Sequence, residues 1–445
     1  MLLRLVILGA LFGFLFGFDE GVIAGALPLI VEHFGITSVG EGLVTAAVPL
    51  GAVFGAVLAA ARADQWGRRT ILLWCSVLFG IGALVSGLAQ GQTGLIVARL
   101  MLGVAVGASA LAAPMFLAEL APAHRRGAVV SAFQLMITVG ILFSYIIDLV
   151  LEPLGAWRWM LALGVVPALI TLIGLRSVPE SPRWLVMRGR VQDATQVVAQ
   201  IQPHLSQQKL TGVITEIDAA HTRAKEHPTS WSMFLAGNLR RVTSFAIIAF
   251  VLQQISGINA VIYYAPTILR HAGFDGSATQ LWATVGIGVV NVLMTVVAML
   301  VVDRLGRRWL FILGFLGTAA SLATIAYAMH GQGDGMAQLA LYGLFAYIAF
   351  FAVSLGPLPW LYMSELFPLA LRSKGMALAS VANWSFNFIV VFLFPILVSA
   401  AGPAVTFALF CIACVIGAVF AFLRAPETKG ISLEALESKE SAGTL

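Results

Sequence analysis

Charged residues are scarce in this chain. Asp, Glu, Lys and Arg make up 11% of its 445 residues, against about 25% in an ordinary soluble domain, while hydrophobic residues make up 60%. A water-soluble fold has no way to bury so large an apolar fraction. The composition therefore excludes an ordinary soluble protein and indicates one that lies in a membrane.

Cysteine and histidine are also few. Cys75, Cys411 and Cys414 all fall in apolar runs, and none of the seven histidines stands beside a second ligand at metal spacing in such a run. A redox or metal site needs a polar, accessible setting and partner ligands. We therefore expect no metal and no cofactor, and cysteines that pack as small core residues. No run holds a nucleophile with a base, so an enzyme is not expected.

Long apolar runs are abundant. A membrane-spanning helix needs about 20 residues, and twelve runs are long enough: 3–30, 41–62, 70–90, 94–119, 128–150, 157–178, 241–270, 280–302, 309–330, 337–363, 375–399 and 403–424. We predict an all-α membrane protein with twelve transmembrane helices in two six-helix lobes. The expected divisions are an N-terminal lobe (1–178), a cytoplasmic linker with short amphipathic helices (179–240), a C-terminal lobe (241–424) and a cytoplasmic tail (425–445).

One short motif occurs twice. DQWGRR at Asp64 to Arg69 returns as DRLGRR at Asp303 to Arg308, each time between two apolar runs. The glycine permits a tight reversal, and the aspartate can accept hydrogen bonds from arginine. Duplicated helical bundles of this kind are typical of secondary transporters, whose substrate site lies between the halves.

The distribution of basic residues predicts the orientation. One set of connections holds most of them: Arg62, Arg68, Arg69, Arg125, Arg126, Arg304, Arg307, Arg308, Arg372 and Lys374. The opposite connections hold Glu32, Glu41, Asp148, Glu152, Asp275 and Asp334, with Arg158 and Arg270 as basic exceptions. We therefore expect a multi-pass protein of the cell (inner or plasma) membrane with both termini and the linker in the cytoplasm. This pattern also explains the net charge of +5, so nucleic acid is not an expected partner.

Further motifs follow the same duplication. In the first half they are Arg99 with Gly103 and Gly107, then Glu119, Pro122, Arg126 and Gly127, then PESPR at 179–183. In the second half they are QQISGINAVIYYAP at 253–266, GPLPW at 356–360, SELFP at 364–368, Arg372 with Gly375, NW at 383–384 and PETKG at 426–430. Together they resemble the sugar porter family of the major facilitator superfamily. The resemblance implies a two-lobed fold, four cytoplasmic helices in the linker and tail, a central monosaccharide site and alternating access.

Amides and aromatic rings are the groups that sugar binding requires, because a hydroxyl both donates and accepts and the C–H face stacks on rings. The resemblance places sugar contacts at Gln134, Gln253, Gln254, Asn259, Asn291, Trp360, Asn383 and Trp384. For any one of the amides, hydrogen bonding between helices is the alternative. The sugar is expected to be glucose or a related hexose, with xylose, galactose or a polyol as alternatives.

Two helices carry candidate gating residues. The resemblance assigns closure of the outer side to Tyr263, Tyr264 and Pro266. It assigns bending of the tenth helix on the inner side to Gly356, Pro357 and Pro359. For the tyrosines, a position in the aromatic belt at the membrane surface is the alternative.

Charges at the cytoplasmic surface orient the protein in the membrane, and they can also act as a gate. Opposed ion pairs could close this side, although each exposed pair contributes only about 0 to 1 kcal/mol. The predicted network comprises Asp64, Arg68, Glu119, Arg126 and Glu180 in the first half, and Asp303, Arg307, Glu365, Arg372 and Glu427 in the second.

Asp19 is an ionisable residue in the first apolar run, which marks a functional position by default. In the resembled family an acid here is typical of proton-coupled members, and Arg99 matches its basic partner. We expect protonation of Asp19 to release Arg99 and so to couple proton entry to sugar entry, with Glu20 a bystander. The alternatives are a pair that only shapes the first helix, a facilitative uniporter, or a transporter-like sugar sensor. The transport unit is expected to be a monomer in membrane lipid.

Overall fold

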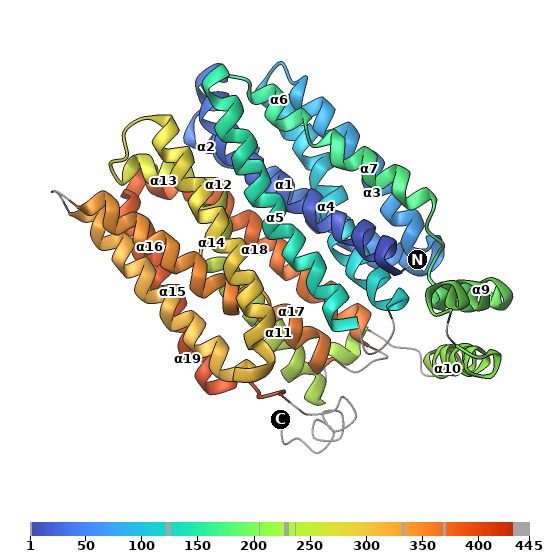
Figure 1. Cartoon of the computed structure of the whole chain (residues 1–445). Helices are drawn as coiled ribbons and strands as arrows, with labels where there is room; N and C mark the ends of the chain where they lie inside the picture. The colour runs from blue at the N-terminus through green and yellow to red at the C-terminus, as the bar shows by residue number, and fades with distance from the viewer. Residues whose placement is uncertain are drawn as a thin grey trace.

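The computed structural model describes residues 2–121, 126–203, 205–226, 231–235, 237–331, 333, 335–367 and 371–429. Within these ranges the chain is helical, without strands, and twelve helical segments are long and apolar enough to cross a membrane. The predicted all-α fold with twelve spans is therefore confirmed. Figure 1 shows the first six spans, in blue to green, packed side by side with the last six, in yellow to red.

The first lobe contains seven helices because its sixth span is broken near Gly164. Its elements are α1 (Leu2–Phe34), α2 (Ser38–Trp66), α3 (Arg68–Gly87), α4 (Gln92–Leu120), α5 (Arg126–Leu151), α6 (Trp157–Ala162) and α7 (Val165–Arg176). Small residues let these helices approach closely. At Gly107 of α4, for example, an added Cβ would lie 2.0 Å from the carbonyl oxygen of Ala52 on α2.

Two membrane spans of the second lobe are interrupted. Its elements are α11 (Gly237–Ile255), α12 (Ile258–Tyr263), α13 (Ala265–His271), α14 (Ser277–Leu305), α15 (Arg307–His330), α16 (Met336–Phe350), the π-helical turn η4 (Phe351–Leu355), α17 (Leu358–Leu366), α18 (Arg372–Ala401) and α19 (Pro403–Arg424). Gly257, at φ +89°, separates α11 from α12. Pro357 and Pro359 follow η4 and cannot donate backbone hydrogen bonds, so the regular helix ends there.

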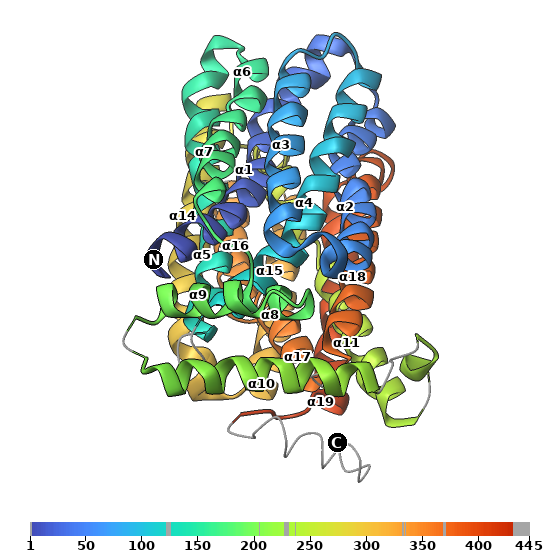
Figure 2. The ribbon, with the colours of Figure 1, turned by 90° about the vertical axis from the view of Figure 1, so that its right-hand side faces the viewer.

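The linker between the lobes is helical and lies across one end of the bundle, as Figure 2 shows. It comprises α8 (Pro182–Met187), α9 (Val191–Ile201), α10 (Gln207–Glu226) and the short η3 (Trp231–Leu235). The apolar face of α9 is buried through Ala194, Val197, Val198 and Ile201. We call this end of the bundle the linker side and the opposite end the far side.

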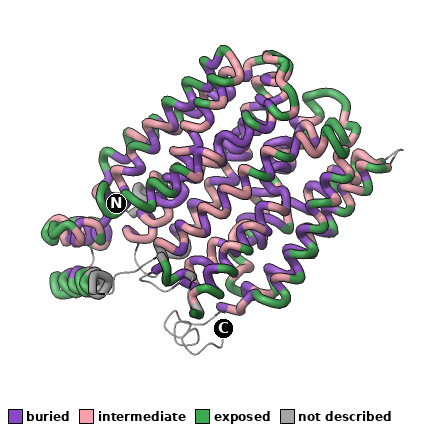
Figure 3. The backbone as a smooth tube through the Cα atoms, turned by 180° about the vertical axis from the view of Figure 1, so that it is seen from behind, coloured by how far each residue is buried: buried purple, intermediate pink, exposed green. Residues whose placement is uncertain are grey.

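Buried residues fill the interior of the bundle, and exposed residues follow its outer faces, as Figure 3 shows. The exposed ones include large apolar side chains such as Phe54, Trp282 and Phe422, which suit contact with lipid.

Three acids expected in far-side connections lie inside helices instead. Glu32 belongs to α1, Glu41 to the first turn of α2, and Asp148 to the last turns of α5. Asp148 is fully buried, and its Oδ2 accepts a hydrogen bond from the backbone N–H of Gly25 at 3.0 Å. Glu41 and Asp148 fall within the predicted runs 41–62 and 128–150, so only the assignment of the three acids to connections was wrong.

Candidate functional site

Asp19 and Arg99 face each other inside the N-terminal lobe. Asp19 Oδ1 on α1 lies 3.9 Å from Arg99 Nη1 on α4, and the two residues are 4% and 0% exposed. Arg99 is held by a second contact, because its Nε donates to the carbonyl oxygen of Val44 at 2.9 Å. Asp19 Oδ2 and both Arg99 Nη atoms are buried without a hydrogen-bond partner in the described structure. The pair thus forms an ion pair longer than a direct hydrogen bond, with donor and acceptor capacity left over.

Glu20 points elsewhere. It is 5% exposed, and its Oε1 accepts a hydrogen bond at 3.3 Å from the hydroxyl of Tyr263, which lies on α12 in the other lobe. Glu20, expected to be a bystander in proton coupling, thus makes a contact between the lobes. The sequence could not show this, because the direction of a side chain depends on how α1 is rotated within the bundle.

Tyr263 and its neighbour Tyr264 lie where the lobes meet on the far side, and both are 1% exposed. The hydroxyl of Tyr264 is 2.6 Å from that of Thr45 on α2 and donates to the carbonyl oxygen of Val391 at 3.3 Å. Such burial differs from that of belt residues exposed at the membrane surface. Pro266 stands in the first turn of α13, directly after the break that follows Tyr264.

A third contact joins the lobes nearby. The Tyr145 hydroxyl on α5 donates to the carbonyl oxygen of Ile262 at 2.9 Å. At Gly42 of α2, an added Cβ would lie 2.5 Å from the carbonyl oxygen of Phe392 on α18. Because Gly42 is near the start of α2 and Tyr145 near the end of α5, these contacts belong to the far half of the bundle. The far side is closed in this structure.

The amides predicted for sugar binding form a connected set in the C-terminal lobe. Asn259 Nδ2 donates to Gln254 Oε1 at 3.0 Å, and Gln254 Nε2 donates to Asn383 Oδ1 at 2.6 Å. These bonds join α12, α11 and α18. Each amide in such a chain is oriented by its neighbour, which leaves defined donors and acceptors for a hydroxyl-rich ligand.

Gln253 connects the same helix to the interrupted tenth span. Its Nε2 donates to the carbonyl oxygens of Leu355 at 2.6 Å and Gly356 at 3.3 Å, which are free to accept because η4 interrupts the helix. Its Oε1 is buried without a partner in the described structure. Gln253, which is predicted to bind sugar, therefore contacts the predicted gating segment of Gly356, Pro357 and Pro359 through Gly356.

Aromatic rings surround these amides. Trp384 on α18 packs against Phe16 of α1 with ring centroids 5.4 Å apart, and this contact crosses between the lobes. Trp360 on α17 packs edge-on against Phe250 of α11 at 4.9 Å. Asn291 is buried in α14, and Gln134 is partly buried in α5, the helix against which α14 packs.

Two residues in this region were missed. Phe16 gives no signal in the sequence, because an aromatic residue in an apolar run is unremarkable. Asn387 is buried with its Oδ1 unpartnered among the described residues, and it follows Asn383 by one helical turn. That spacing places both amides on one face of α18 and could have been recognised from the sequence.

On the linker side, Arg68 joins two acids of its own lobe. It lies 3.0 Å from Asp64 and 3.2 Å from Glu119. Glu119 also accepts a hydrogen bond from the hydroxyl of Ser181, the third residue of the PESPR motif. Both carboxylate oxygens of Glu180 accept the backbone N–H of Arg69 at 3.1 Å. The PESPR motif therefore caps the start of α3.

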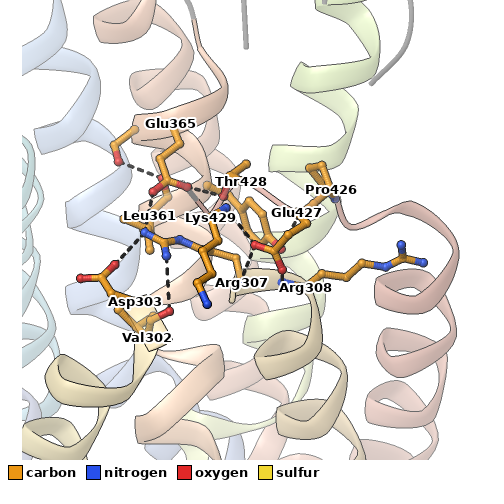
Figure 4. Close-up of polar contacts among 12 residues, drawn as sticks. Val302, Asp303, Arg307, Arg308, Leu361, Glu365, Pro426, Glu427, Thr428 and Lys429 are labelled. Carbon is orange, nitrogen blue, oxygen red and sulfur yellow. Dashed lines mark hydrogen bonds and ion pairs between the residues drawn. The ribbon is translucent and has the colours of Figure 1, made fainter. Parts of the chain in front are cut away.

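The second lobe repeats this arrangement, as Figure 4 shows. Arg307 lies 2.8 Å from Asp303 and 3.1 Å from Glu365, and Thr428 donates to Glu365. Glu427 accepts the backbone N–H groups of Arg307 at 3.0 Å and Arg308 at 3.2 Å. Although burial acts to raise it, the pKa of Glu427 lies below its ordinary value because backbone N–H groups of Arg307, Lys429 and Arg308 stabilise the carboxylate.

The glycines of the duplicated motif are required by these carboxylates. Gly67 and Gly306 have φ of +91° and +86°. A Cβ added at Gly67 would lie 2.3 Å from Glu180 Oε2, and one at Gly306 would lie 2.6 Å from Glu427 Oε2. The sequence indicated a tight turn, and the structure adds that an acid from a distant motif occupies the space a side chain would need.

Arg126 and Arg372 were also predicted in this network, but their side chains lie outside the described residues. In the part of the chain that is described, the ion pairs of the network join residues of the same lobe. Over the same part, no group of three or more His, Cys, Asp and Glu side chains could hold a metal ion.

A family model described as "Sugar (and other) transporter" matches residues 5–439. This chain belongs to the sugar transporter family. The resemblance seen in its motifs is therefore confirmed, and the protein is a multi-pass membrane transporter.

Curated relatives of this sugar transporter cover nearly its whole length. It is 38% identical to the galactose-proton symporter of Escherichia coli (strain K12), over 97% of this chain and 92% of the relative. It is 37% identical to the D-xylose transporter of Levilactobacillus brevis, over 98% and 95%. It is also 37% identical to the glucose transporter GlcP of Staphylococcus epidermidis, over 97% and 95%.

Solved structures agree with the fold of the sugar transporter. The proton:xylose symporter XylE bound to 6-bromo-6-deoxy-D-glucose superimposes with a TM-score of 0.83 at 31% identity, covering 98% of each chain. The inward-open conformation of XylE from E. coli gives a TM-score of 0.84 at 31% identity, over 98% of this chain and 99% of that one.

Proposed function

We propose that this transporter imports a monosaccharide together with a proton by alternating access. The observation that carries the proposal is the buried Asp19–Arg99 pair. An acid and a base enclosed in a membrane lobe, 3.9 Å apart and incompletely hydrogen-bonded, are costly to keep there and are expected to serve transport. Relatives named as proton symporters support the same function.

Coupling at this pair has a direct electrostatic basis. With Asp19 ionised, Arg99 is attracted to it and remains held between α1 and the Val44 carbonyl of α2. Protonation removes the negative charge and leaves Arg99 with the α2 contact alone. A ligand shifts a conformational equilibrium only by binding the two states differently. The proton does so here, because it changes the attraction between helices within the lobe that must rock.

The sugar site lies at the connected amides. Gln254, Asn259 and Asn383 orient one another, and Gln253 Oε1 remains free to accept from a sugar hydroxyl. The Trp384 and Trp360 rings provide apolar faces for the C–H side of the ring. We propose glucose or a related hexose as the substrate, and relatives named for glucose and galactose support a hexose.

The linker side is the cytoplasmic side. Basic residues gather at this end, as the positive-inside rule requires of cytoplasmic loops. They are Arg62, Arg68 and Arg69 in the first lobe and Arg304, Arg307 and Arg308 in the second. The contacts between lobes at Tyr263, Tyr264 and Tyr145 then close the extracellular side. The transport unit is a monomer surrounded by lipid, since the polar site needs only the two lobes of one chain.

The test is uptake of radiolabelled glucose into liposomes with and without an imposed inward proton gradient. Wild type is expected to accumulate glucose above equilibrium only with the gradient. Asp19→Asn is expected to lose accumulation while retaining sugar exchange, and Asp148→Asn is a matched control, because it alters another buried acid of the same lobe that does not face Arg99. Equilibration that ignores the gradient would make the protein a uniporter, and absence of glucose flux would exclude glucose, with xylose, galactose and a polyol as the next sugars to test.

A further inference from the structure

One turn of α1 presents two carboxyl groups to two different lobes. Successive residues of a helix point about 100° apart. Asp19 accordingly faces Arg99 of its own lobe, while Glu20 Oε1 accepts the Tyr263 hydroxyl of the opposite lobe at 3.3 Å. Both acids are buried, so neither is explained as a solvent-exposed residue.

Glu20 adds a carboxyl group to the contacts that close the far side. Thr45 with Tyr264, and Tyr145 with the Ile262 carbonyl, are contacts made by hydroxyl and carbonyl groups. A buried carboxyl group without a hydrogen-bond partner is costly. The Tyr263 hydroxyl therefore stabilises Glu20 in the closed arrangement.

Opening of the far side must break this bond. Glu20 belongs to α1 and Tyr263 to α12, and these helices lie in different lobes. When the lobes separate, both groups lose the partner they have in the closed state. The free energy of the bond therefore contributes to the difference between the two states.

We propose that Glu20 is a positioning residue that holds the far side closed through Tyr263 and transmits movement of the Asp19 turn to the opposite lobe. The second part rests on the proposed function, because it requires that protonation of Asp19 shift this turn of α1. The first part concerns closure alone. Sugar binding itself does not require Glu20, whose partner lies outside the amide chain of Gln254, Asn259 and Asn383.

The experiment measures the distance between lobes in the full-length protein in lipid nanodiscs. Cys75, Cys411 and Cys414 are replaced by Ser, and spin labels are attached at Leu88→Cys and Val405→Cys, two exposed positions near the far ends of α3 and α19. Pulsed electron paramagnetic resonance then gives the ratio of far-side-open to far-side-closed molecules. Thr406→Ala is the matched control, because the buried Thr406 hydroxyl bonds the Gly402 carbonyl at the start of its own helix.

Glu20→Ala and Tyr263→Phe are each expected to raise this ratio about twofold to tenfold, the range of one net hydrogen bond. The double variant is expected to match the larger single effect. Glu20→Gln, which keeps an acceptor oxygen, is expected to restore most of the closure, and Thr406→Ala to leave the ratio unchanged.

The proposal is overturned if Glu20→Ala leaves the ratio at the wild-type value while Tyr263→Phe raises it, or if the two effects multiply in the double variant. If Glu20→Ala does not yield folded protein, Glu20→Leu replaces it in the same cycle. Failure of the proposed symport has a different signature. Wild type would then show no proton-driven accumulation, while the ratio would still respond to Glu20→Ala as predicted.

Discussion

Gln254 donates a hydrogen bond of 2.6 Å to Asn383, which joins the helix before the seventh-span break to the eleventh span. Gln254 also accepts from Asn259, so a single side chain orients two others. A sugar bound here would meet three amides whose directions are already set, which reduces the entropy lost on binding.

Replacement of Gln254 should therefore weaken sugar binding more than the loss of one contact. Gln254→Leu leaves Asn259 and Asn383 unpaired, and unsatisfied buried polar groups cost about 1 to 3 kcal/mol. We expect the half-saturating glucose concentration in exchange assays to rise about tenfold or more. Gln280→Leu is the matched control, because Gln280 bonds the Phe274 carbonyl away from the amide chain. Equal half-saturation for both variants would contradict the assigned sugar site.

Because a carboxylate lies against Gly67 and against Gly306, any side chain at either position should lower the stability of the protein. Gly306→Ala places a Cβ 2.6 Å from Glu427 at a φ of +86°, so the cap must move and the backbone is strained. We expect the free energy of unfolding to fall by about 1 to 3 kcal/mol from the backbone alone, because essentially only glycine adopts this conformation. Thermal unfolding in detergent measures the change. Gly212→Ala in α10, where a Cβ meets open space and alanine favours the helix, should leave the midpoint unchanged or slightly raised. An equal fall for the two variants would argue against the cap.

Glu427 should make stability depend on pH. Because its pKa in the folded protein lies below the ordinary value of 4.5, its stabilising contribution is fully present above that value and is lost as the pH falls through the folded pKa. Wild type and Glu427→Gln should therefore unfold at different temperatures at pH 7 and converge as the pH falls below 4.5 and through the folded pKa. Thermal unfolding in detergent across this pH range checks the prediction. A difference that stays constant with pH would show that the charge of Glu427 is not involved.

Much of the fold could be predicted because membrane helices are specified by local composition. Each span needs only its own run of apolar residues, and the repeated DxxGRR motif placed the two halves in correspondence. The breaks at Gly257 and after Leu355 follow from glycine and proline near those positions. The burial of Asp148 and its bond to the Gly25 N–H could not be predicted, since hydropathy does not show which helix a polar side chain faces.

The site was predictable to the extent that residue chemistry indicates it. Asp19 and Arg99 stand out as charges in apolar runs, and the amides stand out for the same reason. The role of Glu20 was not predictable, because its partner is 243 positions away on the other lobe. Whether neighbouring acids face one lobe or two depends on the rotation and packing of α1, which no local pattern encodes.

Symport through Asp19 requires that a proton enter with each sugar. The most direct measurement is the internal pH of liposomes, reported by an enclosed pH-sensitive dye, when external glucose is added without an imposed proton gradient. Acidification of the lumen is expected with wild type and with Asp148→Asn, and none with Asp19→Asn even though labelled glucose still exchanges. Glucose entry through wild type without acidification, or acidification that survives Asp19→Asn, would contradict symport through Asp19.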